Sequence, residues 1–151
     1  MRKLLVGGLG AVALAAVVMT AYAPASNAQM DLIKERQDTM KAIGGGMKKL
    51  GDMAKGAMAY DAAAVSEAGN AMAEHFAKLA TLVPEGSISD ESYAKPEIWQ
   101  DMAGFTAARE KAEAAAKSLA ATSDEAGFKA ALGDLGGACK GCHEKFRRPK
   151  S

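Results

Sequence analysis

The segment Cys139-Lys140-Gly141-Cys142-His143 constrains this chain more than any other feature of its sequence. Two cysteines separated by two residues lie on nearly the same face of a helix, so both sulfur atoms can reach the two vinyl groups of a single haem. A histidine directly after the second cysteine lies beside the iron and supplies an imidazole nitrogen as axial ligand. The segment therefore predicts one covalent haem c, attached through Cys139 and Cys142, with His143 as a ligand of its iron.

Two other interpretations of the cysteine pair are weaker. An exported protein with two cysteines often joins them in a disulfide. A redox-active pair of this spacing belongs at the strand-to-helix turn of a βαβ unit, whereas the apolar residues of this chain have helical spacing. A zinc site needs two further ligands, and His75, the other histidine of the sequence, cannot supply both.

The first 28 residues have the pattern of a secretory signal peptide. A basic start precedes an uncharged apolar run over residues 4–19, and the small residues Ser26-Asn27-Ala28 follow it. The run is short for a membrane span, which needs about 20 residues, although an uncleaved anchor is the alternative. We therefore expect residues 1–28 to be removed and residues 29–151 to form one domain in the periplasm, without stable membrane insertion.

The charge balance of the chain argues against nucleic acid as a partner. The sequence has 19 Lys and Arg residues against 18 Asp and Glu residues. Loss of residues 1–28 would remove two basic residues and no acidic one, which leaves a nearly neutral domain. Binding to phosphate backbones requires a basic excess, so nucleic-acid binding is not expected.

Four amphipathic helices account for the rest of the chain. The sequence is rich in alanine and methionine but has only four Phe, three Tyr and one Trp, which favours helix over strand. Apolar residues recur seven apart, with alternate spacings of three and four, as in helices that pack at shallow angles. The sequence therefore predicts an all-α, antiparallel four-helix bundle, with helices at about residues 30–55, 61–83, 96–121 and 124–146.

Two local features bear on these helices. Thr122 and Glu125 have the spacing of a capping box, which would begin the last helix. Gly44-Gly45-Gly46 lies inside the first helix, where each glycine costs about 1 kcal/mol relative to alanine. The three glycines indicate either a kink or break, or the close approach of another helix or a bulky ligand.

The haem motif lies close to the last residue of the chain, whereas many small class I cytochromes c carry it near the first. With its four-helix pattern, the chain resembles the class II cytochromes c, the cytochrome c-prime family, over the whole of residues 29–151. The similar segments are Asp31–Gln37 with Met40, Ala54–Gly56, Lys95–Trp99 and Ala138–Phe146.

The resemblance implies roles for three residues of the first helix. Arg36 and Gln37 match positions beside the haem, and Met40 matches the position that faces the iron opposite His143. In some relatives this residue is an apolar plug over a five-coordinate iron, and in others it is a methionine that binds the iron. The chain is most similar to the low-spin, methionine-ligated branch, on the segments Met40-Lys41, Ala54-Lys55-Gly56 and Tyr60-Asp61.

Residue spacing also singles out Arg36 and Met40. Arg36 follows Ile33 by three residues and precedes Met40 by four, so it lies in the apolar seam, where an unpaired charge is costly. Either a haem propionate pairs with its guanidinium, or the side chain reaches water at the end of the bundle. Met40 is either an iron ligand or core filler, and Met47, seven residues on, is the next candidate ligand.

These residues favour an electron carrier that exchanges electrons with periplasmic redox partner proteins. A cluster of basic residues beside the haem motif would steer an acidic partner, although positive charge also suits a solvated helix C-terminus. The cluster consists of Lys140, Lys145, Arg147, Arg148 and Lys150.

The alternative function is a five-coordinate haem protein that binds nitric oxide or carbon monoxide, with Met40 as a plug. We do not expect an enzyme, because haem catalysis uses polar distal groups and the predicted distal side carries methionine and aliphatic side chains. Members of the family often dimerise through their first two helices, and the sequence leaves monomer and homodimer open.

Overall fold

The computed structural model describes residues 26–149, so nearly all of the predicted signal peptide, residues 1–28, lies outside the described residues. The described part is helical, which confirms the predicted all-α class, and none of its helices is long and apolar enough to cross a membrane. The helices are α1 (Asn27–Ala54), α2 (Ala62–Leu79), α3 (Glu97–Gln100), α4 (Met102–Ala120) and α5 (Glu125–Phe146).

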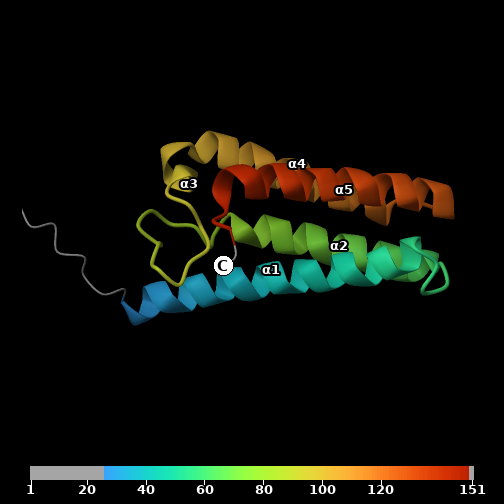
Figure 1. The fold of residues 1–151 in the computed structure, drawn as a ribbon, viewed down its shortest axis with the longest axis horizontal. Coiled ribbons are helices and arrows are strands. Elements are labelled where there is room, and N and C mark those ends of the chain that lie inside the picture. The colour runs from blue at the N-terminus through green and yellow to red at the C-terminus, as the bar shows by residue number, and fades with distance from the viewer. Residues whose placement is uncertain (1–25, 150–151) are drawn as a thin grey trace, which may run out of the picture.

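The four long helices, α1, α2, α4 and α5, form an elongated bundle (Figure 1). The connections between α1 and α2 and between α4 and α5 are short and lie at one end of the bundle, whereas the long α2–α3 loop and α3 lie at the other end. The apolar faces of all four helices meet in one core, as the heptad spacing predicted. Its most deeply buried side chains include Leu50, Val65, Met72, Leu119, Phe128 and Leu135.

The predicted third helix is divided at Asp101. The backbone of Asp101, with φ −135° and ψ 62°, leaves the helical region, and its side chain accepts a hydrogen bond from the Gly104 N–H at 2.9 Å. Asp101 thus ends the short helix α3 and caps the N-terminus of α4. We predicted one continuous helix because the apolar spacing on the two sides of Asp101 stays in register.

Two other predicted helix boundaries differ from the structure. The second helix ends at Leu79 rather than near residue 83, because residues 80–82 form tighter turns in which each N–H bonds the third preceding carbonyl. The last helix is capped by Asp124, which accepts a hydrogen bond from the Gly127 N–H at 2.8 Å. The predicted cap, Thr122, instead donates its hydroxyl to the Leu119 carbonyl of the preceding helix.

The helix α1 runs unbroken through Gly44-Gly45-Gly46. A Cβ atom at Gly46 would lie 3.3 Å from the Met72 sulfur of α2, whereas a Cβ at Gly44 or Gly45 would meet no atom within 4 Å. Close approach of another helix therefore explains Gly46. Gly44 and Gly45 leave open space beside α1.

Candidate haem site

A cavity of about 380 Å³ lies at the end of the bundle that holds the long loop. Its walls come from α1, from the α2–α3 loop with the end of α2, from α3 and α4, and from α5 with the tail that follows it. Most of the lining surface is apolar. The residues that line the cavity include Arg36, Gln37, Met40, Lys41, Gly44, Val83, Ser92, Tyr93, Ala94, Ile98, Phe105, Cys142, His143, Phe146 and Arg147.

The last turns of α5 bring the haem motif to this cavity. Cys142 and His143 line it, whereas Cys139, one turn earlier, packs against the main core of the bundle. Both thiols are free and half-buried, and burial raises the pKa of both. The two cysteines are not joined in a disulfide in this structure.

A second, smaller apolar cluster forms the floor of the cavity. It consists of Val83, Ala94, Ile98, Phe105 and Phe146, and Cys142 packs against it. The rings of Phe105 and Phe146 meet edge to face, with their centroids 5.5 Å apart. This cluster joins α4 to the end of α5 and so supports the turn of helix that carries His143.

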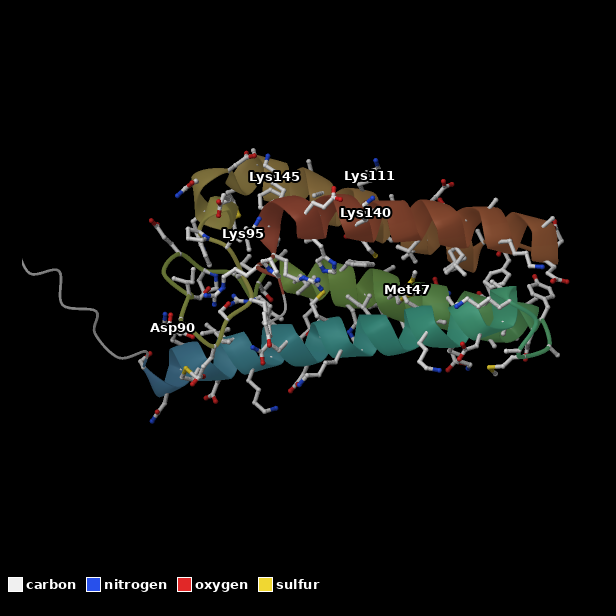
Figure 2. The ribbon with its side chains drawn as sticks, in the orientation of Figure 1. Met47, Asp90, Lys95, Lys111, Lys140 and Lys145 are labelled. Atoms are coloured by element: carbon white, nitrogen blue, oxygen red, sulfur yellow. The ribbon has the colours of Figure 1, made fainter. Side chains whose placement is uncertain are left out.

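The wall opposite His143 is formed by α1. Met40 lines the cavity, as the resemblance implied, and Gly44 follows it one turn later. Met47, the second candidate ligand, is not among the lining residues; it packs partly against the main core and lies farther along α1 (Figure 2). Geometry therefore favours Met40 over Met47 as the residue that faces the cavity.

Arg36 is buried in this wall, with 8% of its surface exposed, so the alternative in which its side chain reaches water is wrong. Its Nη1 donates to the Leu82 carbonyl at 2.9 Å and to the Ser87 hydroxyl at 3.2 Å, and its Nη2 to the Ser87 carbonyl and the Ser92 hydroxyl, both at 2.9 Å. Burial lowers its pKa from the usual value. The terminal N–H groups thus hold the α2–α3 loop, and a propionate would have to compete with that loop for them.

The polar neighbours of Met40 also have partners away from the cavity. The side-chain amide of Gln37 donates to the Glu91 carbonyl at 2.8 Å, and the ammonium of Lys41 pairs with Asp38 at 2.9 Å. Gln37 therefore holds the α2–α3 loop, as Arg36 does.

The sequence did not identify the contribution of the α2–α3 loop. Ser92 is almost fully buried, and its hydroxyl accepts hydrogen bonds from Arg36 and from the Ala94 N–H. Tyr93 and Ala94 line the cavity beside it. The one available signal was a loop with three serines and a single arginine in an apolar seam, but spacing rules do not pair residues that lie 51 to 56 positions apart.

The residues of this cavity fit a haem. Cys142 and His143 open onto an apolar space, and the missing side chain of Gly44 leaves room for a flat group against α1. The described residues hold no cluster of three or more His, Cys, Asp or Glu side chains that could bind a metal ion directly.

The family model for cytochrome c' matches residues 31–147, which include nearly the whole bundle. The chain belongs to the cytochrome c' family. Members of this family carry one covalently bound haem c, so the family and the cofactor predicted from the sequence are both confirmed.

Three relatives illustrate the range of the cytochrome c' family. Cytochrome c' of Rubrivivax gelatinosus is 40% identical over 123 residues, which cover 78% of this chain and 94% of the relative. Cytochrome c-556 of Agrobacterium tumefaciens (strain II Chrys) is 34% identical over 120 residues, 78% of this chain and 98% of the relative. A structure of a nitric oxide complex of a variant cytochrome c prime from Alcaligenes xylosoxidans is similar with a TM-score of 0.74 at 26% identity, covering 81% of this chain and 97% of that one.

Proposed function

We propose that this member of the cytochrome c' family binds small uncharged gases, nitric oxide or carbon monoxide, at the cavity face formed by α1. One observation carries the proposal: the polar side chains of that face are already engaged elsewhere. Arg36 and Gln37 donate to the α2–α3 loop, and Lys41 pairs with Asp38. The face therefore offers Met40 and the open space at Gly44 to a ligand, whereas Arg36, Gln37 and Lys41 each have hydrogen-bond partners outside the cavity space.

The bound haem supplies the iron to which such a gas binds. Cys139, Cys142 and His143 would hold the haem, the apolar floor would exclude water, and Met40 would limit the space left for the gas. An apolar distal side suits a ligand that needs no hydrogen bond and gives little help to oxygen activation, so we propose binding rather than catalysis. A solved relative from Alcaligenes xylosoxidans holds nitric oxide, which supports the proposal. We place this function in the periplasm, because residues 1–28 have the pattern of an export signal.

A second candidate is electron transfer by a low-spin haem with Met40 as its sixth ligand. It is favoured by the position of Met40, which lines the same cavity as His143 from the facing helix α1. Lysines around the end of α5, namely Lys95, Lys140 and Lys145 in Figure 2, would then face an acidic redox partner. Lys145 is already paired with Asp101, and Lys140 lies 3.7 Å from Glu144, so this charge is partly compensated.

An absorption and electron paramagnetic resonance spectrum of the purified holoprotein tests the choice. Gas binding predicts a high-spin, five-coordinate wild type that binds carbon monoxide, and a Met40→Ala variant that binds it several times faster with the same spin state. Met47→Ala, one heptad along α1 and outside the cavity lining, is the matched control and should behave as wild type.

A low-spin wild type that becomes high-spin in Met40→Ala would overturn gas binding as the main function and establish methionine ligation instead. A low-spin wild type that stays low-spin in Met40→Ala would reject both, and Met47→Ala would then test the next sulfur on the same helix.

A further inference from the structure

The α2–α3 loop, residues 80–96, forms one wall of the cavity and is held from two sides. Val83, Ser92, Tyr93 and Ala94 of this loop line the cavity. Arg36 holds the loop from α1, and the tail after α5, residues 147–149, holds it from the other side. The loop therefore bridges the helix that faces the iron and the helix that carries the haem motif.

The contact between loop and tail is made by residues that line the cavity. Ala94 and Arg147 form an isolated antiparallel bridge, and both belong to the lining. Two backbone hydrogen bonds accompany the bridge, from Lys95 N to Phe146 O at 3.0 Å and from Arg148 N to Tyr93 O at 2.7 Å. Because the bridge is isolated rather than part of a sheet, its separation would open the cavity wall without disturbing any helix.

The two arginines hold the loop with unequal strength. Arg36 is buried and donates four hydrogen bonds from its two terminal nitrogens. The half-buried Arg148 donates from Nη2 alone, to the Ser89 carbonyl at 3.0 Å and the Asp90 carbonyl at 3.1 Å. Its Nε and the Ser89 hydroxyl are buried and have no hydrogen-bond partner among the described residues. The Arg148 side of the loop is therefore the side that releases more easily.

We propose that residues 87–95 form a latch over the cavity, that Arg36 is its fixed anchor, and that Arg148 is a positioning residue which sets how often the latch opens and how fast a small ligand enters. The role in ligand entry rests on the gas-binding function proposed above. Arg148 acts through the loop, since it is not among the residues that line the cavity.

Amide hydrogen exchange and carbon monoxide binding, both measured on the holoprotein, test the latch in wild type and Arg148→Met. The variant keeps the long side chain but loses the bonds to Ser89 and Asp90. Exchange of the amides of residues 92–95 should become about tenfold faster, the factor that corresponds to about 1.4 kcal/mol. The carbon monoxide association rate should rise severalfold, while the absorption spectrum and the exchange of the α2 and α4 amides stay unchanged.

Lys129→Met is the matched control, because Lys129 is exposed on α5 outside the haem motif and pairs only with the exposed Glu125. It should leave both measurements at their wild-type values. Unchanged exchange of residues 92–95 in Arg148→Met would overturn the latch. Faster exchange with an unchanged association rate would overturn its role in ligand entry. A wild type that binds no carbon monoxide would overturn the proposed function, whereas the exchange rates would still decide whether the latch exists.

Discussion

The α2–α4 side of the bundle and the α1–α5 side use glycine in opposite ways. On the first side, Gly69 of α2 is buried, and a Cβ there would lie 2.8 Å from the Ala120 Cβ and backbone nitrogen and 2.9 Å from the Ala116 carbonyl of α4. On the other side, a Cβ at Gly44 would meet no atom within 4 Å, although Gly44 lies on the cavity wall. Gly69 allows the backbones of α2 and α4 to touch. Gly44 has no side chain, so the space between α1 and α5 stays open beside it.

The contrast separates the part of the molecule that holds the fold from the part that holds the haem. The helices α2 and α4 pack along each other more extensively than any other pair, whereas α1 and α5 touch much less. The close-packed side needs no cofactor to be complete. A haem in the cavity would add packing to the open side, so we expect the two sides to respond differently to added volume.

The largest effect is expected on the close-packed side. Gly69→Leu places a large side chain where even a Cβ is too close to the backbone of Ala120, so we expect a loss of about 3 kcal/mol in the free energy of unfolding. Urea unfolding followed by circular dichroism measures it. Gly45→Leu, at an exposed position of α1 with open space around it, is the control and should cost far less. Equal losses would show that the two sides are packed alike.

The next effect concerns the buried anchor of the open side. Arg36→Met removes four hydrogen bonds between α1 and the α2–α3 loop, and we expect a loss of about 2 kcal/mol in unfolding free energy with the haem still attached. Lys34→Met, which breaks only an exposed pair with Asp38, should change stability little. Denaturant unfolding monitored at the haem absorption band distinguishes them. A stability equal to that of Lys34→Met would mean that the loop does not depend on Arg36.

A smaller effect separates two neighbouring glycines of α1. Gly45→Ala should stabilise the holoprotein by about 0.8 kcal/mol, because alanine is the better helix former and its Cβ meets nothing. Gly44→Ala should gain less, because its Cβ enters the cavity that the haem occupies. Thermal unfolding of the two holoproteins measures the difference. Identical gains would place Gly44 outside the space that the haem fills.

The smallest effect is a pH dependence at the junction of α4 and α5. The Lys145 ammonium and the Gly104 N–H both hold the pKa of Asp101 below its usual value. A carboxylate with a lowered folded pKa adds stability above its unfolded pKa, about 3.9, and this is lost as the pH falls through the folded pKa. In Asp101→Asn, the free energy of unfolding should therefore fall less steeply below about pH 4 than in the wild type. Urea unfolding midpoints at several pH values measure this difference.

Lys145→Met serves as the partner variant of Asp101→Asn, because it removes the larger cause of the lowered pKa and keeps the cap on α4. Lys145→Met should reduce the loss of stability below about pH 4 only in part. An unaltered pH profile in Asp101→Asn would show that other carboxylates control the acid limb.

The sequence predicted what depends on local spacing. The heptad positions located the four long helices, and the CxxCH segment identified Cys142 and His143, which line the cavity, because both patterns lie within a few turns of one helix. The split at Asp101 was not predicted, because apolar spacing does not report whether a polar residue caps a helix or lies on its surface. The correct cap of α5, Asp124, stood two residues from the predicted Thr122, within the usual uncertainty of a helix start.

The sequence did not predict contacts between residues that are far apart along the chain. Arg36 was identified as a charge in an apolar seam, but its partners Ser87 and Ser92 lie in a loop that carries no periodic pattern. The bridge between Ala94 and Arg147 likewise joins two segments outside the long helices. Such pairings depend on how the helices come together at one end of the bundle, and the spacing of residues along the sequence does not describe that arrangement.

The cavity is bounded by α1 and α5, which are separated along the chain by all of α2, α3 and α4. We expect the contact between α1 and α5 to form late in folding, because it joins helices that are farther apart along the chain than the α2–α4 and α4–α5 pairs. Until that step, the helix face that bears Cys139 and Cys142 stays uncovered by α1. The order of folding thus keeps both thiols accessible during the interval in which thioether bonds to the haem have to be made.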